Sequence, residues 1–298
     1  MLGETFVRLS VRILTCRPKG RNATKRIKDI FGTKVYDCFI FFNELEILEM
    51  RLHELSPYVD YFVIVEATKT FGGKEKTLYF KENENKFAEF KEKIIHIIVD
   101  DMPDIAENSR LPLQAYQRNQ IKRGLSGCSA NDIIMMSDVD EIPNSQKIEE
   151  MVFLLNTAAK TLYYKQNFYY YYLNGRVINY IWHGTACCKA HTFLGDFHQN
   201  AHEMWRIFNG NDNYIAHGGW HFSYLGGVAS IIRKISTINI SEYDDDKYKN
   251  ENTLGRKIEN GEDLFDRDLT IKYGQIDTDY PRHLLKRIDK YRHLIKDL

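Results

Sequence analysis

The stretch NDIIMMSDVDEIP, residues 131–143, decides the fold prediction for this chain. Its apolar run, residues 133–136, is typical of a short buried strand inside a parallel sheet. Three carboxylates follow within four residues, namely Asp138, Asp140 and Glu141. Because Asp138 and Asp140 are two positions apart, an extended backbone would point both to the same side. They are therefore expected at the mouth of a sheet, where ligands of open α/β folds bind.

This carboxylate pair has two interpretations. Carboxylate pairs of this kind hold Mg²⁺ or Mn²⁺, usually with a substrate phosphate completing the coordination shell. An ordinary acidic turn after a strand has the same letters, and the DxD pattern is short enough to occur often by chance. The stretch by itself leaves both interpretations open.

Alternating strand and helix patterns surround this stretch. Strands are predicted at residues 35–42, 61–66, 94–99 and 133–136, and helices at residues 43–55, 87–93 and 111–125. Further helices are predicted at residues 148–159, 253–261 and 281–298, and one or two strands at residues 161–173. Four strand–helix steps by residue 140 predict an α/β fold with a largely parallel sheet flanked by helices.

Two aromatic strings in the second half each have a structural and a functional interpretation. The run YYKQNFYYYYL, residues 163–173, fits core tyrosines and also fits a stacking platform for bases or sugars. The string HGGWHFSY, residues 217–224, places two glycines beside a Trp and a His, which implies close backbone approach. The approaching group is either a ligand or the neighbouring strand of a glycine-bulged sheet.

The composition excludes several classes of protein. The 298 residues are 43% hydrophobic and 28% charged, which is ordinary for a soluble globular chain. A net charge of zero and a pI of about 7.1 argue against non-specific binding to nucleic acid. No run approaches the roughly 20 apolar residues of a membrane span, and no signal peptide is recognised. Five cysteines without CxxC or zinc spacing favour a reducing compartment, so a cytoplasmic location is expected.

Five strings, in this order along the chain, resemble the family 17 glycosyltransferases, which include the transferases that add bisecting GlcNAc. The strings are FFNELEILEMRLHEL, VDYFVIVEATKTFGGKEKTL, SDVDEIP, GGWHFSYLGG and YPRHLLKRIDKYRHLI. They cover about residues 36–296, which is nearly the whole chain. The resemblance implies a single GT-A-like domain at residues 36–298, after a basic and weakly ordered lead-in at residues 1–35.

The resemblance also implies an activity. Members of the family are inverting transferases that use a UDP-sugar and a divalent metal, typically Mn²⁺, with Mg²⁺ as the alternative. The expected substrates are therefore a nucleotide sugar and a glycan or glycoprotein acceptor. GlcNAc is the sugar that the family implies, and UDP-xylose, UDP-glucose and UDP-galactose remain alternative donors because anchorless relatives have unassigned sugars.

Site residues are carried over by position. The resemblance assigns Asp138 and Asp140 to the metal and the diphosphate, and His221 to a late metal or phosphate ligand. The residues expected to bind the donor end the first strands or carry a basic side chain: Asn43, Glu44, Glu66, Lys76, Arg118, Asp138 and Lys234.

The catalytic base is the least determined part of the predicted site. Inversion requires one carboxylate to take the proton of the acceptor hydroxyl. Glu242, which opens an acidic loop, is the first candidate, and Glu141 and Asp263 are alternatives. Glu141 has a second possible role in orienting the metal ligands. Two other functions remain open: a non-catalytic glycan-binding protein and a metal-dependent nucleotide-sugar hydrolase.

Overall fold

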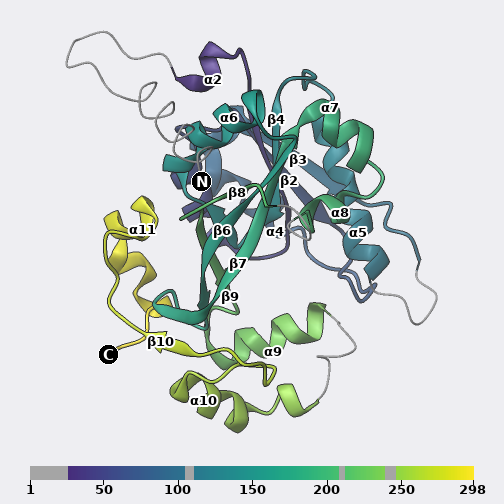
Figure 1. The fold of residues 1–298 in the computed structure, drawn as a ribbon. Helices are drawn as coiled ribbons and strands as arrows, with labels where there is room; N and C mark the ends of the chain where they lie inside the picture. Colours follow the sequence, from purple (N-terminus) through teal and green to yellow (C-terminus); the bar gives the residue numbers. More distant parts are fainter. Residues whose placement is uncertain (1–25, 105–110, 208–211, 239–245) are drawn as a thin grey trace.

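The computed structural model describes residues 26–104, 111–207, 212–238 and 246–298 (Figure 1). The strands are β1 (Val35–Phe41), β2 (Tyr61–Ala67), β3 (Ile94–Val99), β4 (Ile133–Asp138), β5 (Glu141–Pro143), β6 (Thr161–Tyr170), β7 (Gly175–Lys189), β8 (Tyr214–Ile215), β9 (Gly219–Ser223) and β10 (Ile271–Tyr273). The α-helices are α2 (Ile27–Ile30), α3 (Leu45–Leu55), α4 (Tyr79–Asn83), α5 (Leu111–Asn119), α6 (Ile148–Thr157), α7 (Ala190–Thr192), α8 (Ala201–Trp205), α9 (Gly227–Ile238), α10 (Glu251–Asn260) and α11 (Arg282–Lys286). Tighter or wider helical segments are η1 (Glu84–Lys93), η2 (Gln120–Leu125), η3 (Ser145–Lys147), η4 (Phe193–Phe197), η5 (Asp246–Tyr248) and η6 (Ile288–Leu294).

One sheet connects the strands in the order β3-β2-β1-β4-β7-β6-β9-β5, with β10 beside β7 and β8 beside β6. The first four strands are parallel to one another. The long strand β7 then runs antiparallel to both β4 and β6. The predicted α/β fold is confirmed, with the parallel strands gathered in the first half of the sheet and mixed pairing in the second half.

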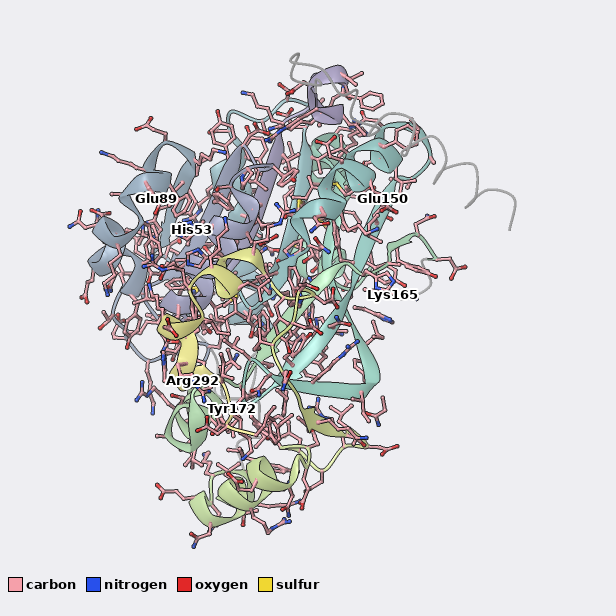
Figure 2. All side chains as sticks on the ribbon, turned by 90° about the vertical axis from the view of Figure 1, so that its left-hand side faces the viewer. His53, Glu89, Glu150, Lys165, Tyr172 and Arg292 are labelled. Atoms are coloured by element: carbon pink, nitrogen blue, oxygen red, sulfur yellow. The ribbon has the colours of Figure 1, made fainter. Side chains whose placement is uncertain are left out.

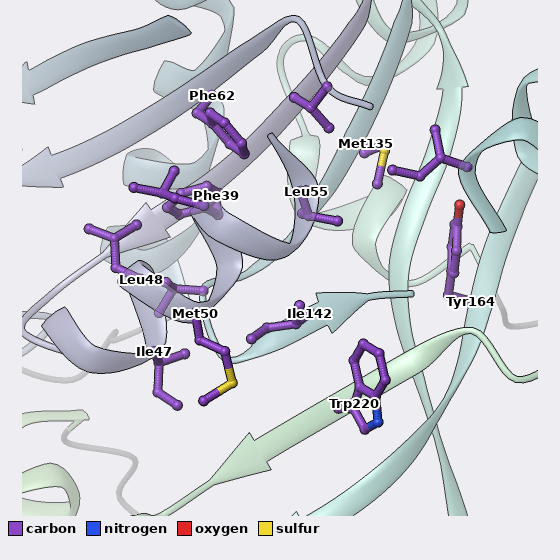
Figure 3. Close-up of a cluster of buried hydrophobic side chains, with 14 of the residues drawn as sticks. Phe39, Ile47, Leu48, Met50, Leu55, Phe62, Met135, Ile142, Tyr164 and Trp220 are labelled. Atoms are coloured by element: carbon purple, nitrogen blue, oxygen red, sulfur yellow. The ribbon is translucent and has the colours of Figure 1, made fainter. Parts of the chain in front are cut away.

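Helices cover both faces of the parallel strands, which explains why β1 is buried along its whole length. Side chains alternate along β1, so that Phe39 faces the core under α3, while Cys38 faces the core under α5. Figure 3 shows the first core, where Leu48 and Leu55 of α3 lie against Phe39 and Phe62. The C-terminal edge of these strands is thereby held rigidly from two sides.

The tyrosine-rich segment is part of the core. Tyr163, Tyr164, Tyr169, Tyr170 and Tyr171 are all at most 5% exposed. Consecutive tyrosines are buried, and not only alternate ones, because the two faces pack into different cores: Tyr169 lies in the core under α3, and Tyr170 lies in a core with α9 and α10. The core interpretation of this run is therefore confirmed.

The C-terminal segment differs from its prediction. Instead of one helix over residues 281–298, α11 ends near Arg287, whose φ of −130° is not helical, and η6 follows. The segment packs over α3, with His293 3.1 Å from Glu46. In Figure 2 the yellow C-terminal ribbon crosses in front of α3 near the labelled residue His53.

The N-terminal boundary also differs from the prediction. Residues 1–25 lie outside the described residues, but α2 is joined to the domain by a hydrogen bond from the Ile27 amide to Glu149 (2.7 Å). Lys28 pairs with Asp60 at 2.5 Å. The fold therefore begins before residue 36. Across the described ranges, no helix combines the length and apolar character that crossing a membrane requires.

Candidate functional site

A cavity of about 130 Å³ lies at the carboxyl ends of β1 and β4. Its wall combines three phenylalanines, three lysines and three carboxylates: Phe41, Phe42, Phe71, Lys69, Lys76, Lys234, Glu44, Asp138 and Asp140. The DxD pair thus lies where the sequence placed it, at the mouth of the parallel strands. The reason is different, because the chain leaves β4 at Asp138 and turns at residues 139–140. A turn, and not a continuous extended strand, brings both carboxylates to the cavity.

A buried arginine holds this turn from beneath. Arg51 of α3 is fully buried and forms two charge-assisted hydrogen bonds with Asp37 of β1, at 2.8 and 2.6 Å. Its Nη1 donates to the carbonyl oxygens of Asp138, Val139 and Glu141 at 3.0, 3.3 and 2.8 Å. A guanidinium has five N–H donors in a fixed plane, so one side chain can hold three carbonyl groups of the turn.

Asp138 lies between the cavity and a second set of buried groups. One of its oxygens, Oδ1, accepts a hydrogen bond from Nη2 of Arg118, which is fully buried on α5. The other terminal nitrogen of Arg118 is 2.8 Å from Nδ1 of His202 on α8. The guanidinium lies over the ring of Trp205, 4.9 Å from its centre. Arg118 therefore fixes Asp138 from the side of α8 and does not line the cavity.

Both carboxylate oxygens of Asp140 have a partner, and the side chain is only 9% exposed. Oδ2 accepts a hydrogen bond from Lys234 of α9 at 3.1 Å, and Oδ1 is 3.6 Å from Nε2 of His221 on β9. Burial by itself favours the neutral acid, but Lys234 and His221 outweigh it and hold the pKa of Asp140 well below its usual range. Asp140 is therefore ionised at neutral pH.

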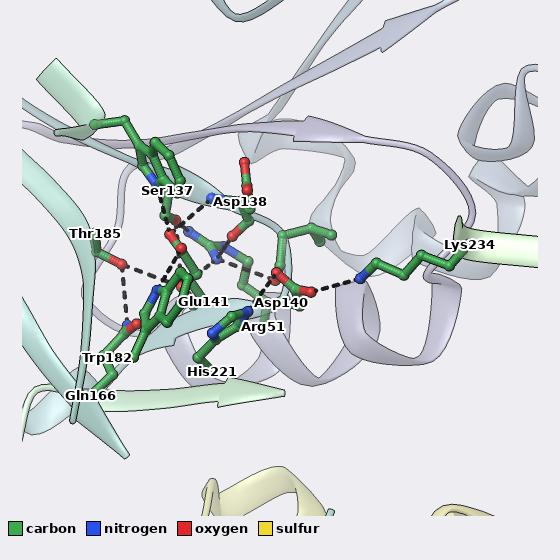
Figure 4. Close-up of polar contacts among 12 residues, drawn as sticks. Arg51, Ser137, Asp138, Asp140, Glu141, Gln166, Trp182, Thr185, His221 and Lys234 are labelled. Atoms are coloured by element: carbon green, nitrogen blue, oxygen red, sulfur yellow. Dashed lines mark hydrogen bonds and ion pairs between the residues drawn. The ribbon is translucent and has the colours of Figure 1, made fainter. Parts of the chain in front are cut away.

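Glu141 is fully buried behind the turn (Figure 4). Oε1 accepts the indole N–H of Trp182 at 2.7 Å, and Oε2 accepts the indole N–H of Trp205 at 3.3 Å. The Asp138 amide also donates to Oε2, at 3.1 Å. Burial, followed by repulsion from Asp138, raises the pKa of Glu141 to about 7. Both oxygens are engaged within the protein, so Glu141 orients the turn and the two indoles.

Most of the predicted donor residues are brought together. Glu44, Lys76 and Lys234 line the cavity with the two aspartates, while Asn43 lines an adjoining cavity that also reaches Asp140. Burial lowers the pKa of Lys76, with Glu66 and Glu44 acting in the opposite direction.

Two predicted residues have structural roles instead. Glu66 is fully buried and caps the start of α4, where its Oε1 accepts the Phe80 amide at 2.9 Å. Asp263 is 4% exposed and accepts hydrogen bonds from the Phe265 amide and from Arg267. Neither residue lines either cavity, because their oxygens complete local backbone turns. Glu242 lies outside the described residues.

The donor types at the turn suit a divalent cation. Arg118 engages only Oδ1 of Asp138, which leaves Oδ2 for a metal, whereas the two oxygens of Asp140 face Lys234 and His221. Two carboxylates and one imidazole are donors that Mn²⁺ accepts. Their ligand atoms do not all lie within 4.8 Å of one another, as those of Glu49, His53 and His283 do among the described residues.

Several residues of the site escaped the sequence prediction. Asp37 and Arg51 carried a signal, because a charge inside an apolar strand and a charge on the apolar face of a helix each require a buried partner. Trp182, Trp205 and His202 carried none, since only the packing of β7 and α8 against the turn brings them to Glu141 and Arg118.

Comparisons with known proteins identify relatives of limited coverage. A β-1,4-mannosyl-glycoprotein 4-β-N-acetylglucosaminyltransferase of Homo sapiens is 27% identical over 107 residues, which cover 34% of this chain and 20% of that protein. The Mus musculus protein of the same name is 26% identical over the same shares. The matched region thus spans about a fifth of the length of these relatives.

Two solved structures share a distant likeness. A putative glucose-1-phosphate thymidylyltransferase of Bacillus anthracis has a TM-score of 0.36 at 10% identity, covering 62% of this chain and 86% of that one. Glucosyl-3-phosphoglycerate synthase of Mycobacterium tuberculosis, solved with Mn²⁺ and UDP-glucose, has a TM-score of 0.30 at 15% identity, covering 52% and 50%. Scores this low give no information on the site.

The family model has far greater coverage than these individual matches. The model of glycosyltransferase family 17 matches residues 14–296, which include both aspartates of the turn, His221 and the C-terminal segment over α3. A match over nearly the whole length assigns the family: the chain belongs to glycosyltransferase family 17.

Proposed function

We propose that this protein is an inverting, metal-dependent glycosyltransferase that moves a sugar from a UDP-sugar to a hydroxyl of a glycan. The observation that carries the proposal is the turn at Asp138–Asp140. It brings two carboxylates to one cavity, with Oδ2 of Asp138 left for a metal and Asp140 held between Lys234 and His221. GlcNAc is the proposed sugar, because the curated relatives are named as N-acetylglucosaminyltransferases.

The cavity has the chemistry of a nucleotide site. Phe41, Phe42 and Phe71 offer apolar surface to a base, and Lys76 and Lys234 offer positive charge to a diphosphate. Lys234 remains protonated at neutral pH. Burial favours its neutral form, but Asp140 and Glu44 outweigh burial and raise its pKa. Lys234 therefore has two roles, which are to keep Asp140 ionised and to attract the anionic donor.

Asp138, Asp140 and His221 would hold Mn²⁺ or Mg²⁺. When bound, the cation would neutralise charge on the leaving nucleoside diphosphate. Arg51 would keep the two carboxylates in place while the donor enters and leaves. It does this through the backbone of the turn and not through the carboxylates themselves.

The base remains open among the predicted carboxylates. Asp263 accepts hydrogen bonds from Arg267, and Glu141 is fully buried with both oxygens accepting hydrogen bonds. Both carboxylates are therefore poor candidates for the base. Glu242 stays the first candidate from the sequence.

Transfer assays test the proposal directly. Purified protein would be incubated with UDP-GlcNAc, UDP-xylose, UDP-glucose or UDP-galactose and a mixture of glycan acceptors, with Mn²⁺ or with EDTA. We expect a glycosylated product with Mn²⁺, none with EDTA, and a loss of at least about a hundredfold in Asp140→Asn. Asp29→Asn, an exposed aspartate on α2, is the matched control and should keep wild-type activity.

Three outcomes would contradict the proposal. Wild-type activity of Asp140→Asn, or activity that EDTA leaves unchanged, would refute the metal site. Breakdown of the donor at full rate without acceptor would indicate a hydrolase. Glycan binding that requires neither nucleotide nor metal, with no product, would indicate a non-catalytic binding protein.

A further inference from the structure

Two tryptophans contact the carboxylate turn through Glu141, and Figure 4 shows Trp182 on the side of the turn away from Lys234. Trp182 of β7 and Trp205 of α8 donate to different oxygens of Glu141, and both rings remain partly exposed. Glu141 also accepts the amide hydrogen of Asp138, so one carboxylate connects both indoles to the backbone of a proposed metal ligand. Neither tryptophan lines the cavity assigned to the nucleotide.

Aromatic surface continues outward from Trp182 along β7. Tyr180 is two positions away on the same face of the strand, its ring centre 6.4 Å from that of Trp182, and it is 43% exposed. Ile178 follows on this face and is 52% exposed. Phe168 of β6 packs beneath both rings, at 5.3 Å from Trp182 and 6.3 Å from Tyr180. Exposed apolar side chains in a continuous row, next to a polar centre, are typical of a binding surface.

Buried donors beside Trp205 lack partners. Nε of Arg118 and Nε2 of His202 are both buried without a hydrogen-bond acceptor among the described residues. Since Arg118 donates to Nδ1 of His202, the imidazole carries its hydrogen on Nε2. Buried donors without a partner are rare in folded proteins and call for a ligand or an ordered water. The ring of His202 is 5.4 Å from that of Trp205, so these donors lie next to Trp205 but are themselves buried.

We propose that Tyr180, Trp182 and Trp205 form the acceptor subsite and bind a pyranose ring by its C–H face. A pyranose has an apolar face, which suits aromatic rings that are exposed or partly exposed, such as those of Tyr180 and Trp182. The subsite reaches the turn through Glu141, which holds both indoles and accepts the amide hydrogen of Asp138. A sugar held there would lie beside the turn that also borders the nucleotide cavity. The inference rests on the proposed function and adds the class of acceptor and the residues that select it.

A nucleotide base would also stack on aromatic rings, but the structure places three phenylalanines for that purpose in the cavity with Lys76 and Lys234. Both indole N–H groups donate to the carboxylate of Glu141, and the guanidinium over Trp205, that of Arg118, is already paired with Asp138. A neutral ring is therefore favoured there over an anionic one.

Binding measurements without turnover test the subsite. The probes are methyl β-D-glucopyranoside, methyl β-D-galactopyranoside, methyl α-D-mannopyranoside and methyl N-acetyl-β-D-glucosaminide, which have no aromatic aglycone. Saturation-transfer NMR and tryptophan fluorescence would measure glycoside binding, and thermal shift would measure binding of UDP with Mn²⁺. The variants are Tyr180→Ala, Trp182→Phe and, as an exposed aromatic on α2's C-terminal side, the control Phe31→Ala.

We expect at least one glycoside to bind the wild type and Phe31→Ala equally, and to bind Tyr180→Ala about tenfold more weakly. UDP binding should be unchanged in Tyr180→Ala. Trp182→Phe keeps a ring but loses the bond to Glu141, so it should retain more glycoside binding than Tyr180→Ala does. A folded Tyr180→Ala with unchanged glycoside affinity, equal weakening of UDP, or no glycoside binding to the wild type would overturn the subsite. Failure of the wild type to bind UDP would instead contradict the proposed function, whatever the glycosides do.

Discussion

On the cavity side of the turn at residues 138–141, charged groups are buried and paired, whereas on the β7 side aromatic rings reach the surface. Arg51 and Asp37 have no exposed surface, while Tyr180 and Ile178 keep about half of theirs. The parallel strands end in a buried polar support beside the cavity that we propose for the nucleoside diphosphate. Strand β7 carries the exposed aromatic row that we propose for the acceptor sugar. Under these two proposals, one turn serves both the donor and the acceptor.

The largest effect is expected from removing the buried Arg51–Asp37 pair, which supports the turn. Arg51→Met leaves the carboxylate of Asp37 buried without a partner, and we expect a loss of about 3–5 kcal/mol in the free energy of unfolding. Urea denaturation at pH 7 measures it. The double variant Asp37→Leu/Arg51→Met, which removes both charges, should regain part of that loss. Arg287→Met, at an exposed arginine, is the control and should change the free energy of unfolding little. A loss in Arg51→Met as small as that of the control would refute the supporting role of Arg51.

A second test concerns the pair of histidines between α3 and α11, where the C-terminal segment packs on the domain. The rings of His53 and His283 stack at 3.9 Å, and burial together with His53 lowers the pKa of His283 to about 4. Figure 2 places His53 near Glu89, which lies 3.6 Å from its Nε2. Between pH 6.5 and 4 the unfolded chain binds more protons at His283 than the folded chain, so stability rises with pH across this window.

The acid loss from His283 should reach at most about 3 kcal/mol at pH 4. Unfolding measured at pH 4.5, 5.5 and 6.5 should show a shallower slope in His283→Phe than in the wild type. His191→Phe, at an exposed histidine, should keep the wild-type slope. Parallel slopes in His283→Phe and the wild type would mean that His283 titrates normally in the folded protein.

A smaller effect is expected where the cavity meets solvent. Lys234→Met leaves Asp140 with His221 alone, so the pKa of Asp140 should rise and the free energy of unfolding at pH 7 should fall by about 2 kcal/mol. UDP binding should weaken in the same variant. Lys86→Met, at an exposed lysine, should change neither quantity. Normal UDP binding in Lys234→Met would remove Lys234 from the donor site.

The smallest expected effect is at Ser137. Its hydroxyl oxygen accepts a hydrogen bond from Arg51 Nη2 at 2.6 Å, but Arg51 keeps its other acceptors when the hydroxyl is lost. Ser137→Ala should therefore reduce the free energy of unfolding by about 1 kcal/mol. A loss as large as that of Arg51→Met would place the centre of the support at Ser137 instead of at the Arg51–Asp37 pair.

How much the sequence predicts follows from which forces act locally. The strands at residues 35–41, 61–67 and 133–138 were predictable because both of their faces are buried and their sequences are largely apolar. The strand at residues 94–99 was predictable from its apolar run alone, because it lies at the edge of the sheet and is partly exposed. The break at Arg287 was not, since the segment bends to pack over α3, and tertiary contacts overrode its helical pattern.

The site follows the same rule. The DxD pair was found from its position after a strand, whereas Glu66 was assigned to the donor although its carboxylate caps α4. A carboxylate at a strand end can face a ligand or a helix start, and only the three-dimensional path of the loop decides between them. Trp205 lies 67 positions after Asp138, so no local pattern joins it to the turn.

The most direct test of the account is the thermal stability of the wild type and Asp140→Asn with UDP, in Mn²⁺ and in EDTA. A ligand that binds only the folded state raises the unfolding midpoint by mass action, by an amount equivalent to about 2.7 kcal/mol at a hundred times its dissociation constant. The account predicts a rise for the wild type with UDP and Mn²⁺, and no rise in EDTA or in Asp140→Asn. An equal rise in Asp140→Asn, or none in the wild type, would contradict the assignment of the turn to the donor diphosphate.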